Sequence, residues 1–217
     1  MKIRLIGLVA ITLSGAAQAS PVFEGRSSNG AIDLTCTAHG DAGTNMCAMF
    51  YHRNLDITIL NNWSIGAAPW DGYSPSTTTA QTLAEAAGSS ATGLTGWGLP
   101  TGDATEPAGA LNQFKSIWND VGASFSFLEA QFAGVRNAPF DFYWSSTIQP
   151  GFPGRAYGFY TGDGRQFTDA AYYALSVVAV RPGDVAQAVP EPQTYALMLV
   201  GLCLMGLVTR RDKKKQS

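Results

Sequence analysis

Three strand-like runs within Phe140–Arg181 constrain the fold more than any other part of the sequence. The first, Tyr143–Thr147, has two aromatic residues followed by three small hydroxyl residues, which suits a strand with one packed and one hydrogen-bonding face. The others are Ala156–Thr161 and Tyr172–Arg181, and between them lies the turn signal Gly162-Asp163-Gly164. We therefore expect a small antiparallel sheet that closes a compact domain.

Two helices are expected before this sheet. The first covers Thr77–Ala87, with Ser76 as its cap and Gly88 at its end. The second starts after a cap at Asp103 or Thr105 and keeps apolar residues three to four apart until Gly122 ends it. The last run of the sheet, Tyr172–Arg181, is apolar on both faces, which predicts a central strand.

The segment before these helices contains one more expected strand and two cysteines. Leu55–Leu60 alternates apolar and polar residues, which predicts a half-buried strand. Ser20–Gly30 is polar and is expected to be a loose lead-in, while Ala31–Thr35 and Met46–Tyr51 are expected strands. Between these two lies a loop rich in turn residues.

Cys36 and Cys47 flank this loop, eleven residues apart. In an oxidising compartment such a pair is most simply a disulfide. The alternative is a metal site that adds His39 and His52, although this ligand spacing matches no compact zinc pattern.

Both ends of the chain have the sequence patterns of targeting segments. Basic residues, the apolar run Leu5–Leu13 and a small-x-small sequence predict a signal peptide over residues 1–19, cleaved between Ala19 and Ser20. The alternative is a retained anchor, for which this run is short. At the other end, Tyr195–Val208 is apolar and a basic cluster that includes Arg210 and Arg211 follows it, as in a stop-transfer segment.

The motif Pro190-Glu191-Pro192 stands directly before the apolar run and prevents a helix from continuing into it. With the short membrane segment and the basic end, it resembles the PEP-CTERM sorting signal of Gram-negative bacteria. The resemblance implies that residues 189–217 anchor the protein transiently in the inner membrane until an exosortase, a membrane protease, removes them. The alternative is an ordinary C-terminal anchor that is retained.

Charge limits the partners of the part between the two targeting segments. Residues 20–188 carry seven Lys and Arg against fourteen Asp and Glu, a formal balance of −7. Such an acidic body argues against nucleic acid or an anionic membrane surface as its ligand.

The body resembles the Lcl C-terminal-domain family, a branch of the C-type-lectin-like folds. The pieces that match, in order, are Leu55–Thr58, the helix Thr77–Ala87, Trp97–Thr101, the helix through Trp118, Tyr143–Thr147, Ala156–Phe159 and Val178–Arg181. The resemblance implies an α+β domain over residues 55–188, with two helices packed on a small antiparallel sheet, and residues 20–54 as a lead-in. Gly98 stands where members typically have arginine, which removes any contact that this arginine makes.

Three aromatic residues in a Gly- and Pro-containing loop are the first candidates for ligand binding: Trp63, Trp70 and Tyr73. Exposed rings in such a loop can stack on sugar faces. The alternative is that they pin the loop onto the core.

Asp163 and Asp169 are candidate calcium ligands. The alternative is that Asp163 belongs to a simple hairpin turn, and too few oxygen ligands accompany the two carboxylates for a calcium site. Calcium-dependent C-type lectins use a Trp-Asn-Asp triplet on a late strand. Here Trp118-Asn119-Asp120 falls at the end of an expected helix, so we expect Trp118 in the core. No cofactor and no metal are expected.

Catalytic signals are weak in this sequence. Ser145 or Ser146 would need His39 or His52 as a base, and no nucleophile elbow is present. We expect a non-catalytic exported protein of the cell surface or extracellular matrix, with a carbohydrate or matrix polymer as the ligand that the resemblance implies. The alternatives are a secreted hydrolase of matrix polysaccharide and a self-associating structural protein.

Overall fold

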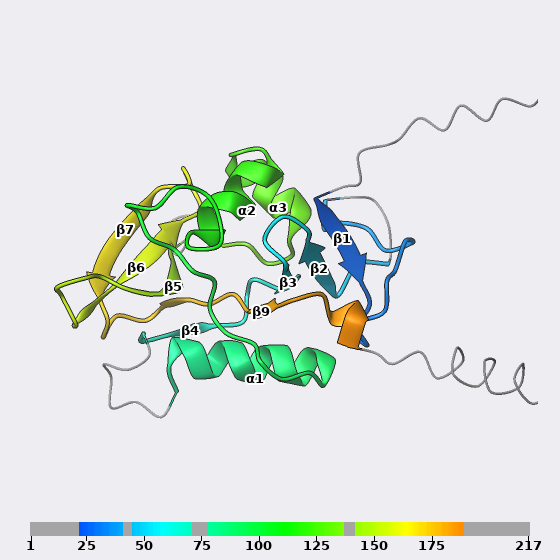
Figure 1. The fold of residues 1–217 in the computed structure, drawn as a ribbon, viewed down its shortest axis with the longest axis horizontal. Coiled ribbons are helices and arrows are strands. Elements are labelled where there is room, and N and C mark those ends of the chain that lie inside the picture. The colour runs from blue at the N-terminus through cyan, green and yellow to red at the C-terminus, as the bar shows by residue number, and fades with distance from the viewer. Residues whose placement is uncertain (1–21, 41–44, 71–77, 137–141, 189–217) are drawn as a thin grey trace, which may run out of the picture.

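A computed structural model describes residues 22–40, 45–70, 78–136 and 142–188, which form two sheets and three helices (Figure 1). The first sheet has the order β1 (Phe23–Arg26), β2 (Met49–His52), β3 (Ile57–Leu60) and β9 (Val180–Pro182), all antiparallel. The second has the order β4 (Ala67–Ala68), β8 (Leu175–Ser176), β5 (Phe142–Ile148), β6 (Arg155–Tyr160) and β7 (Gln166–Ala170). The expected α+β class is confirmed, whereas the lectin-like assignment stays a prediction.

The predictions for both termini lie outside the described residues. They comprise cleavage at Ala19 and Ser20, the Pro190–Pro192 motif, the apolar run and the basic end. Within the described ranges no helix is long and apolar enough to cross a membrane.

The expected central strand Tyr172–Arg181 is wrong. It contains two short strands, of which β8 belongs to the second sheet and β9 to the first. The three residues between them, Val177–Ala179, are fully buried and cross from one sheet to the other. Val178 packs into one core cluster, while Val177 and Ala179 pack into another. The two-sided apolar pattern therefore reflects a link between two sheets.

The expected loose lead-in is also wrong, because Phe23–Arg26 is the edge strand β1 and pairs with β2. The expected boundary at residue 54 falls between β2 and β3, which are hydrogen-bonded neighbours in one sheet. All four residues of β3 are buried rather than half of them. Ala31–Thr35 forms no strand, although Ile32 makes an isolated bridge to Arg26. The predicted Cys36–Cys47 disulfide is confirmed, with the two Cα atoms 4.8 Å apart.

Helix α1 (Ala80–Thr92) begins later and ends later than the sequence predicts. Thr79 caps it in a capping box with Thr82, and Gly93 ends it in the left-handed conformation. Gly88 lies inside the helix, where a Cβ atom would stand 2.2 Å from the Trp97 ring. This glycine therefore permits close packing of an aromatic ring and does not stop the helix.

Helix α2 (Gln113–Val121) ends at Gly122 as predicted, but its cap is Asn112. Asp103 instead accepts hydrogen bonds from the backbone and hydroxyl of Thr105, which forms a turn. The helix α3 (Phe125–Gln131) was not expected, since its seven residues bury only Leu128 and give little periodic signal. A short 3-10 helix, η1 (Val185–Ala188), follows β9.

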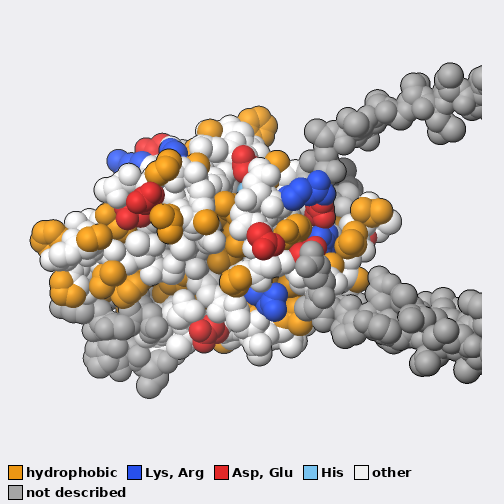
Figure 2. Space-filling model, in the orientation of Figure 1, with side chains coloured by type: hydrophobic (Ala, Val, Ile, Leu, Met, Phe, Trp, Pro, Cys, Tyr) orange, Lys and Arg blue, Asp and Glu red, His pale blue; other side chains and the backbone are white. Residues whose placement is uncertain are grey.

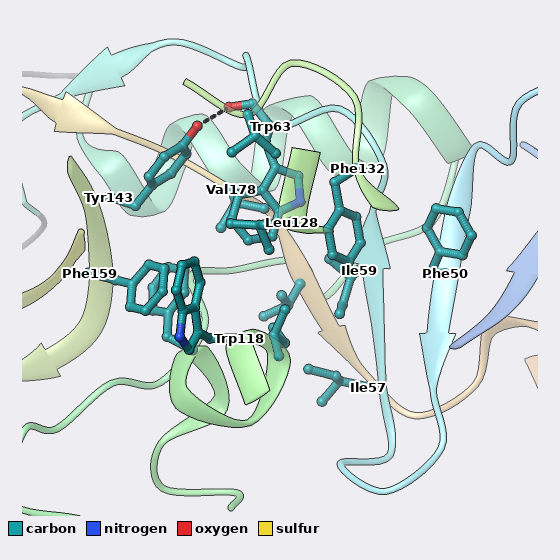
Figure 3. Packing of buried hydrophobic residues seen from close by; sticks show 14 of the residues in the cluster. Phe50, Ile57, Ile59, Trp63, Trp118, Leu128, Phe132, Tyr143, Phe159 and Val178 are labelled. Carbon is teal, nitrogen blue, oxygen red and sulfur yellow. Dashed lines mark hydrogen bonds between the residues drawn. The ribbon is translucent and has the colours of Figure 1, made fainter. Parts of the chain in front are cut away.

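The core between α2, α3 and the sheets is built around Trp63 (Figure 3). This ring stacks on Phe132 at a centroid distance of 4.9 Å and meets the edge of Tyr143 at 5.4 Å. The Tyr143 hydroxyl donates to the Trp63 carbonyl at 3.3 Å. These contacts fix the loop that leads from β3 to β4.

Candidate functional site

Large hydrophobic side chains stand exposed at one end of the second sheet, where the turn between β5 and β6 meets the turn after β7. We call them the aromatic face, which consists of Ile148, Phe152, Tyr172 and Tyr173. The Ala171 N–H donates to the Gly154 carbonyl at 2.9 Å, which holds the two turns side by side. Figure 2 shows hydrophobic side chains gathered at the left end of the molecule, where Figure 1 places these turns.

Two adjacent tyrosines dominate this face. Tyr172 and Tyr173 are 59% and 47% exposed, and their ring centroids lie 4.5 Å apart at an angle of 47°. A hydrogen bond with Tyr173 raises the pKa of the Tyr172 hydroxyl, and nearby Asp169 raises it further while Arg155 lowers it. The face therefore presents apolar rings beside hydroxyl and charged groups.

Two tryptophans hold the backbone beneath these rings. Fully buried Trp144 donates its indole N–H toward the carbonyls of Ala68 and Tyr173, at 3.1 and 3.3 Å. The backbone N–H of Trp70 donates to Ala171 at 2.8 Å, and its indole N–H donates to Ser145 at 2.7 Å. Because Trp144 belongs to β5 and Trp70 donates to Ser145 of β5, both tryptophans tie the turn to this strand, and the tyrosines stand on a fixed base.

The aromatic candidates from the sequence lie elsewhere. Trp63 cannot stack on a ligand, because its side chain is fully buried in the core. Trp70 is partly buried and supports the aromatic face from below. Tyr73 lies outside the described residues. Trp63 therefore agrees with the alternative, in which the ring pins its loop onto the core, and not with ligand binding.

Sequence reasoning missed Tyr172 and Tyr173 because it assigned them to a strand. Adjacent residues of a strand point to opposite faces, so a strand would have buried one of them. They instead lie in a turn, in which the Tyr173 N–H donates to the Ala170 carbonyl at 3.0 Å. The turn signal Gly151-Phe152-Pro153-Gly154 is the feature that could have indicated an exposed Phe152.

The metal candidates do not come together. Asp163 lies before β7 and accepts from the Arg165 N–H, whereas Asp169 lies near its far end and accepts from the Ala170 N–H. In the part of the chain that the structure describes, no group of three His, Cys, Asp or Glu residues could hold a metal ion. Trp118 is buried in α2 rather than on a late strand, so Trp118-Asn119-Asp120 does not have the placement of the lectin triplet.

The candidate nucleophile and the histidines are also separated. The buried hydroxyl of Ser145 lies 3.0 and 2.9 Å from the carbonyl oxygens of Gly102 and Tyr157. His39 contacts the Glu129 carbonyl at 3.0 Å, and His52 lies beside Asp120. None of these contacts joins Ser145 to a histidine.

His52, the last residue of β2, is buried and faces Asp120 of α2, and it is held in one tautomer. Its Nδ1 accepts the Leu55 N–H at 3.3 Å, so the proton stays on Nε2, 3.0 Å from an Asp120 oxygen. Desolvation lowers the pKa of this histidine, and the Asp120 carboxylate opposes the shift without cancelling it. A second proton on His52 would displace the Leu55 N–H.

We expect the free energy of unfolding to fall as the pH drops below about 6.5, the pKa of an unfolded histidine. Below that pH the unfolded state binds a proton that the folded state resists, so stability falls by at most about 1.4 kcal/mol per pH unit. Urea unfolding between neutral and mildly acidic pH measures this slope. His52→Asn keeps an acceptor for the Leu55 N–H and should flatten it. An unchanged slope in this variant would contradict the assignment to His52.

The tail is similar to a known sorting signal. The PEP-CTERM protein-sorting motif matches residues 188–214, a range that includes Pro190, Glu191, Pro192, Arg210 and Arg211. No curated protein matches this sequence. The motif indicates an exported protein that is transiently anchored in a membrane and processed by an exosortase. The predicted PEP-CTERM signal is thereby confirmed.

Proposed function

We propose that the protein is a non-catalytic binding protein of the cell surface or extracellular matrix, and that its aromatic face contacts a carbohydrate or matrix polymer. The exposure of Tyr172 and Tyr173 on a fixed base carries this proposal. Tyrosine offers a rigid, amphipathic contact area at low entropic cost. Its ring can pack on the C–H face of a sugar while its hydroxyl bonds to the sugar hydroxyls.

The arrangement of the body supports this role during export. β1 and η1, at the two ends of the described chain, lie at one end of the molecule, and the turns that carry the aromatic face lie at the opposite end (Figure 1). The sorting tail follows η1 in the sequence. The face is therefore remote from the point at which the tail joins the body.

A lectin-like class for the body is part of the same proposal. The two expected helices precede the closing strands in the observed order α1, α2, α3, β5, β6. This order agrees with the Lcl C-terminal-domain resemblance and supports the proposed carbohydrate ligand.

Co-sedimentation of the full chain with the host's extracellular polysaccharide tests this function. A detergent without a sugar headgroup should be used, so that it does not compete. We expect saturable binding that the double substitution Tyr172→Ser/Tyr173→Ser weakens by at least about tenfold, because it removes both rings. Phe127→Ser, at an exposed phenylalanine of α3, is the matched control and should bind normally.

Absence of binding by the unaltered chain would remove the carbohydrate role. Loss of binding with a calcium chelator would instead point to a metal-dependent site. Self-association is the second candidate function, because the same face exposes four large hydrophobic side chains. Sedimentation velocity at several protein concentrations would reveal it, and the double tyrosine variant should then stay monomeric.

A further inference from the structure

A polar pocket of about 250 Å³ lies at the opposite end of the β6–β7 hairpin from the aromatic face. Its walls are the loop 104–108, one side of α2 and the turn 164–166. The polar side chains that line it are Glu106, Asn112, Lys115, Asn119, Arg165 and Gln166. Its volume is below the roughly 300–1,000 Å³ of pockets for drug-sized ligands, which suits one small polar group.

The floor of the pocket is fixed by Asn112, which is 1% exposed. Its amide nitrogen shares two N–H groups among three acceptors at 2.7–2.9 Å, which are the carbonyl oxygens of Asp103 and Glu106 and the side-chain oxygen of Gln166. In return the Gln166 amide donates to the Asn112 oxygen at 2.8 Å. These bonds join all three walls.

The hairpin wall is fixed by the contact between Gly164 and Trp118. Gly164 has a φ of 74°, and a Cβ atom there would stand 2.3 Å from the Trp118 indole. The turn therefore lies directly on a buried ring and presents Arg165 at the pocket rim.

The charged side chains that line the pocket are its most informative feature. Lys115 is partly buried, yet none of the ion pairs among the described residues includes it. Arg165 makes a long, exposed contact of 3.7 Å with Asp163, and its guanidinium lies over the Tyr160 ring at 4.8 Å from the centroid. A partly buried lysine that makes no ion pair favours an anionic oxygen as the partner of its ammonium group. Glu106 adds a carboxylate, which can accept bonds from hydroxyl groups.

We infer that this pocket binds one acidic sugar residue, a polyhydroxylated ring with a single carboxylate. Its carboxylate pairs with Lys115 and Arg165, and its hydroxyls bond to Asn119 and Glu106. A neutral sugar would leave the ammonium unpaired, and a simple anion would leave Glu106 without a donor. The formal balance of −7 on residues 20–188 repels densely charged polyanions. The inference assigns a chemical class to the polymer of the proposed function, and in that respect it rests on the proposed function.

NMR titration of the isotope-labelled full chain in the same detergent tests the pocket directly, with glucuronic acid and glucose as paired probes. We expect glucuronic acid to shift the amide signals of Lys115, Asn119 and Arg165, and glucose to leave them unchanged. Lys115→Gln should weaken glucuronic acid binding by about tenfold, because it removes a charge-assisted hydrogen bond. Arg181→Gln is the matched control, since Arg181 lies outside the pocket and donates to the backbone carbonyls of Thr95 and Pro182.

Equal shifts with both sugars, no shifts, or unchanged affinity in Lys115→Gln would overturn the inference. Failure of the pocket can be distinguished from failure of the proposed function by the co-sedimentation assay, because polymer binding in that assay depends on Tyr172 and Tyr173. Polymer binding without glucuronic acid binding would remove the inference alone. Glucuronic acid binding without polymer binding would retain the pocket as a site for a free sugar acid and remove the polymer role.

Discussion

Replacement of Arg26 by alanine should destabilise the folded protein by about 3–5 kcal/mol, the range for breaking a buried ion pair. The Arg26 side chain is fully buried, and two of its nitrogens lie 2.9 and 2.7 Å from the carboxylate oxygens of Asp184. A third contact, at 2.9 Å, joins it to Glu24. The substitution would leave the partly buried Asp184 carboxylate without its cation.

This pair joins β1 to the segment before η1, across nearly the whole length of the body in sequence. Burial alone would raise the pKa of Asp184, but the hydrogen bonds from Arg26 and the Ala186 N–H outweigh it and lower the pKa. The folded state therefore prefers the ionised carboxylate, and this contribution is lost as the pH falls through the folded pKa.

Urea unfolding at neutral pH measures the effect. Arg53→Ala is the matched control, because Arg53 also pairs with Glu24 but is 45% exposed. Its loss should stay below about 1 kcal/mol, as for surface ion pairs. Equal losses in both variants would show that burial of Arg26 contributes nothing.

Replacement of Trp63 by alanine should cost about 3–5 kcal/mol of stability and leave ligand binding by the folded fraction intact. The ring packs between Phe132 and Tyr143, so its removal leaves a cavity that these neighbours cannot fill. This outcome separates a core tryptophan from the ligand-binding role that the sequence suggests.

Thermal and urea unfolding, together with the co-sedimentation assay, distinguish the two roles. Trp63→Phe is the control, since the Trp63 indole N–H makes no hydrogen bond among the described residues and only packing is lost. Its destabilisation should be smaller than that of the alanine variant. A stable Trp63→Ala protein that no longer binds polymer would place the ring in the ligand site.

Much of the local structure could be predicted from the sequence. The expected strands at Tyr143–Thr147 and Ala156–Thr161 correspond within one residue to β5 and β6. The stop of α2 at Gly122 and the Cys36–Cys47 disulfide were also predictable. Each depends on residue types close together in the chain or on a short covalent loop.

The candidate site could not be predicted in the same way. Exposure of an aromatic residue depends on which distant segments cover it, and the sequence suggested Trp63 while the structure exposes Tyr172 and Tyr173. The polar pocket likewise joins a loop, a helix and a hairpin turn that are far apart in the chain.

The sequence alone determined how this protein is sorted, which is indicated by the PEP-CTERM motif over residues 188–214. A sorting signal of this kind is recognised as a linear segment, so no tertiary contact is needed to identify it. The tertiary structure alone decided that Val177–Ala179 links two sheets, that Arg26 is buried against Asp184, and which aromatic rings face solvent. The physical reason is that burial is a property of contacts between distant segments. An apolar or charged residue has the same local pattern whether such a contact covers it or leaves it exposed.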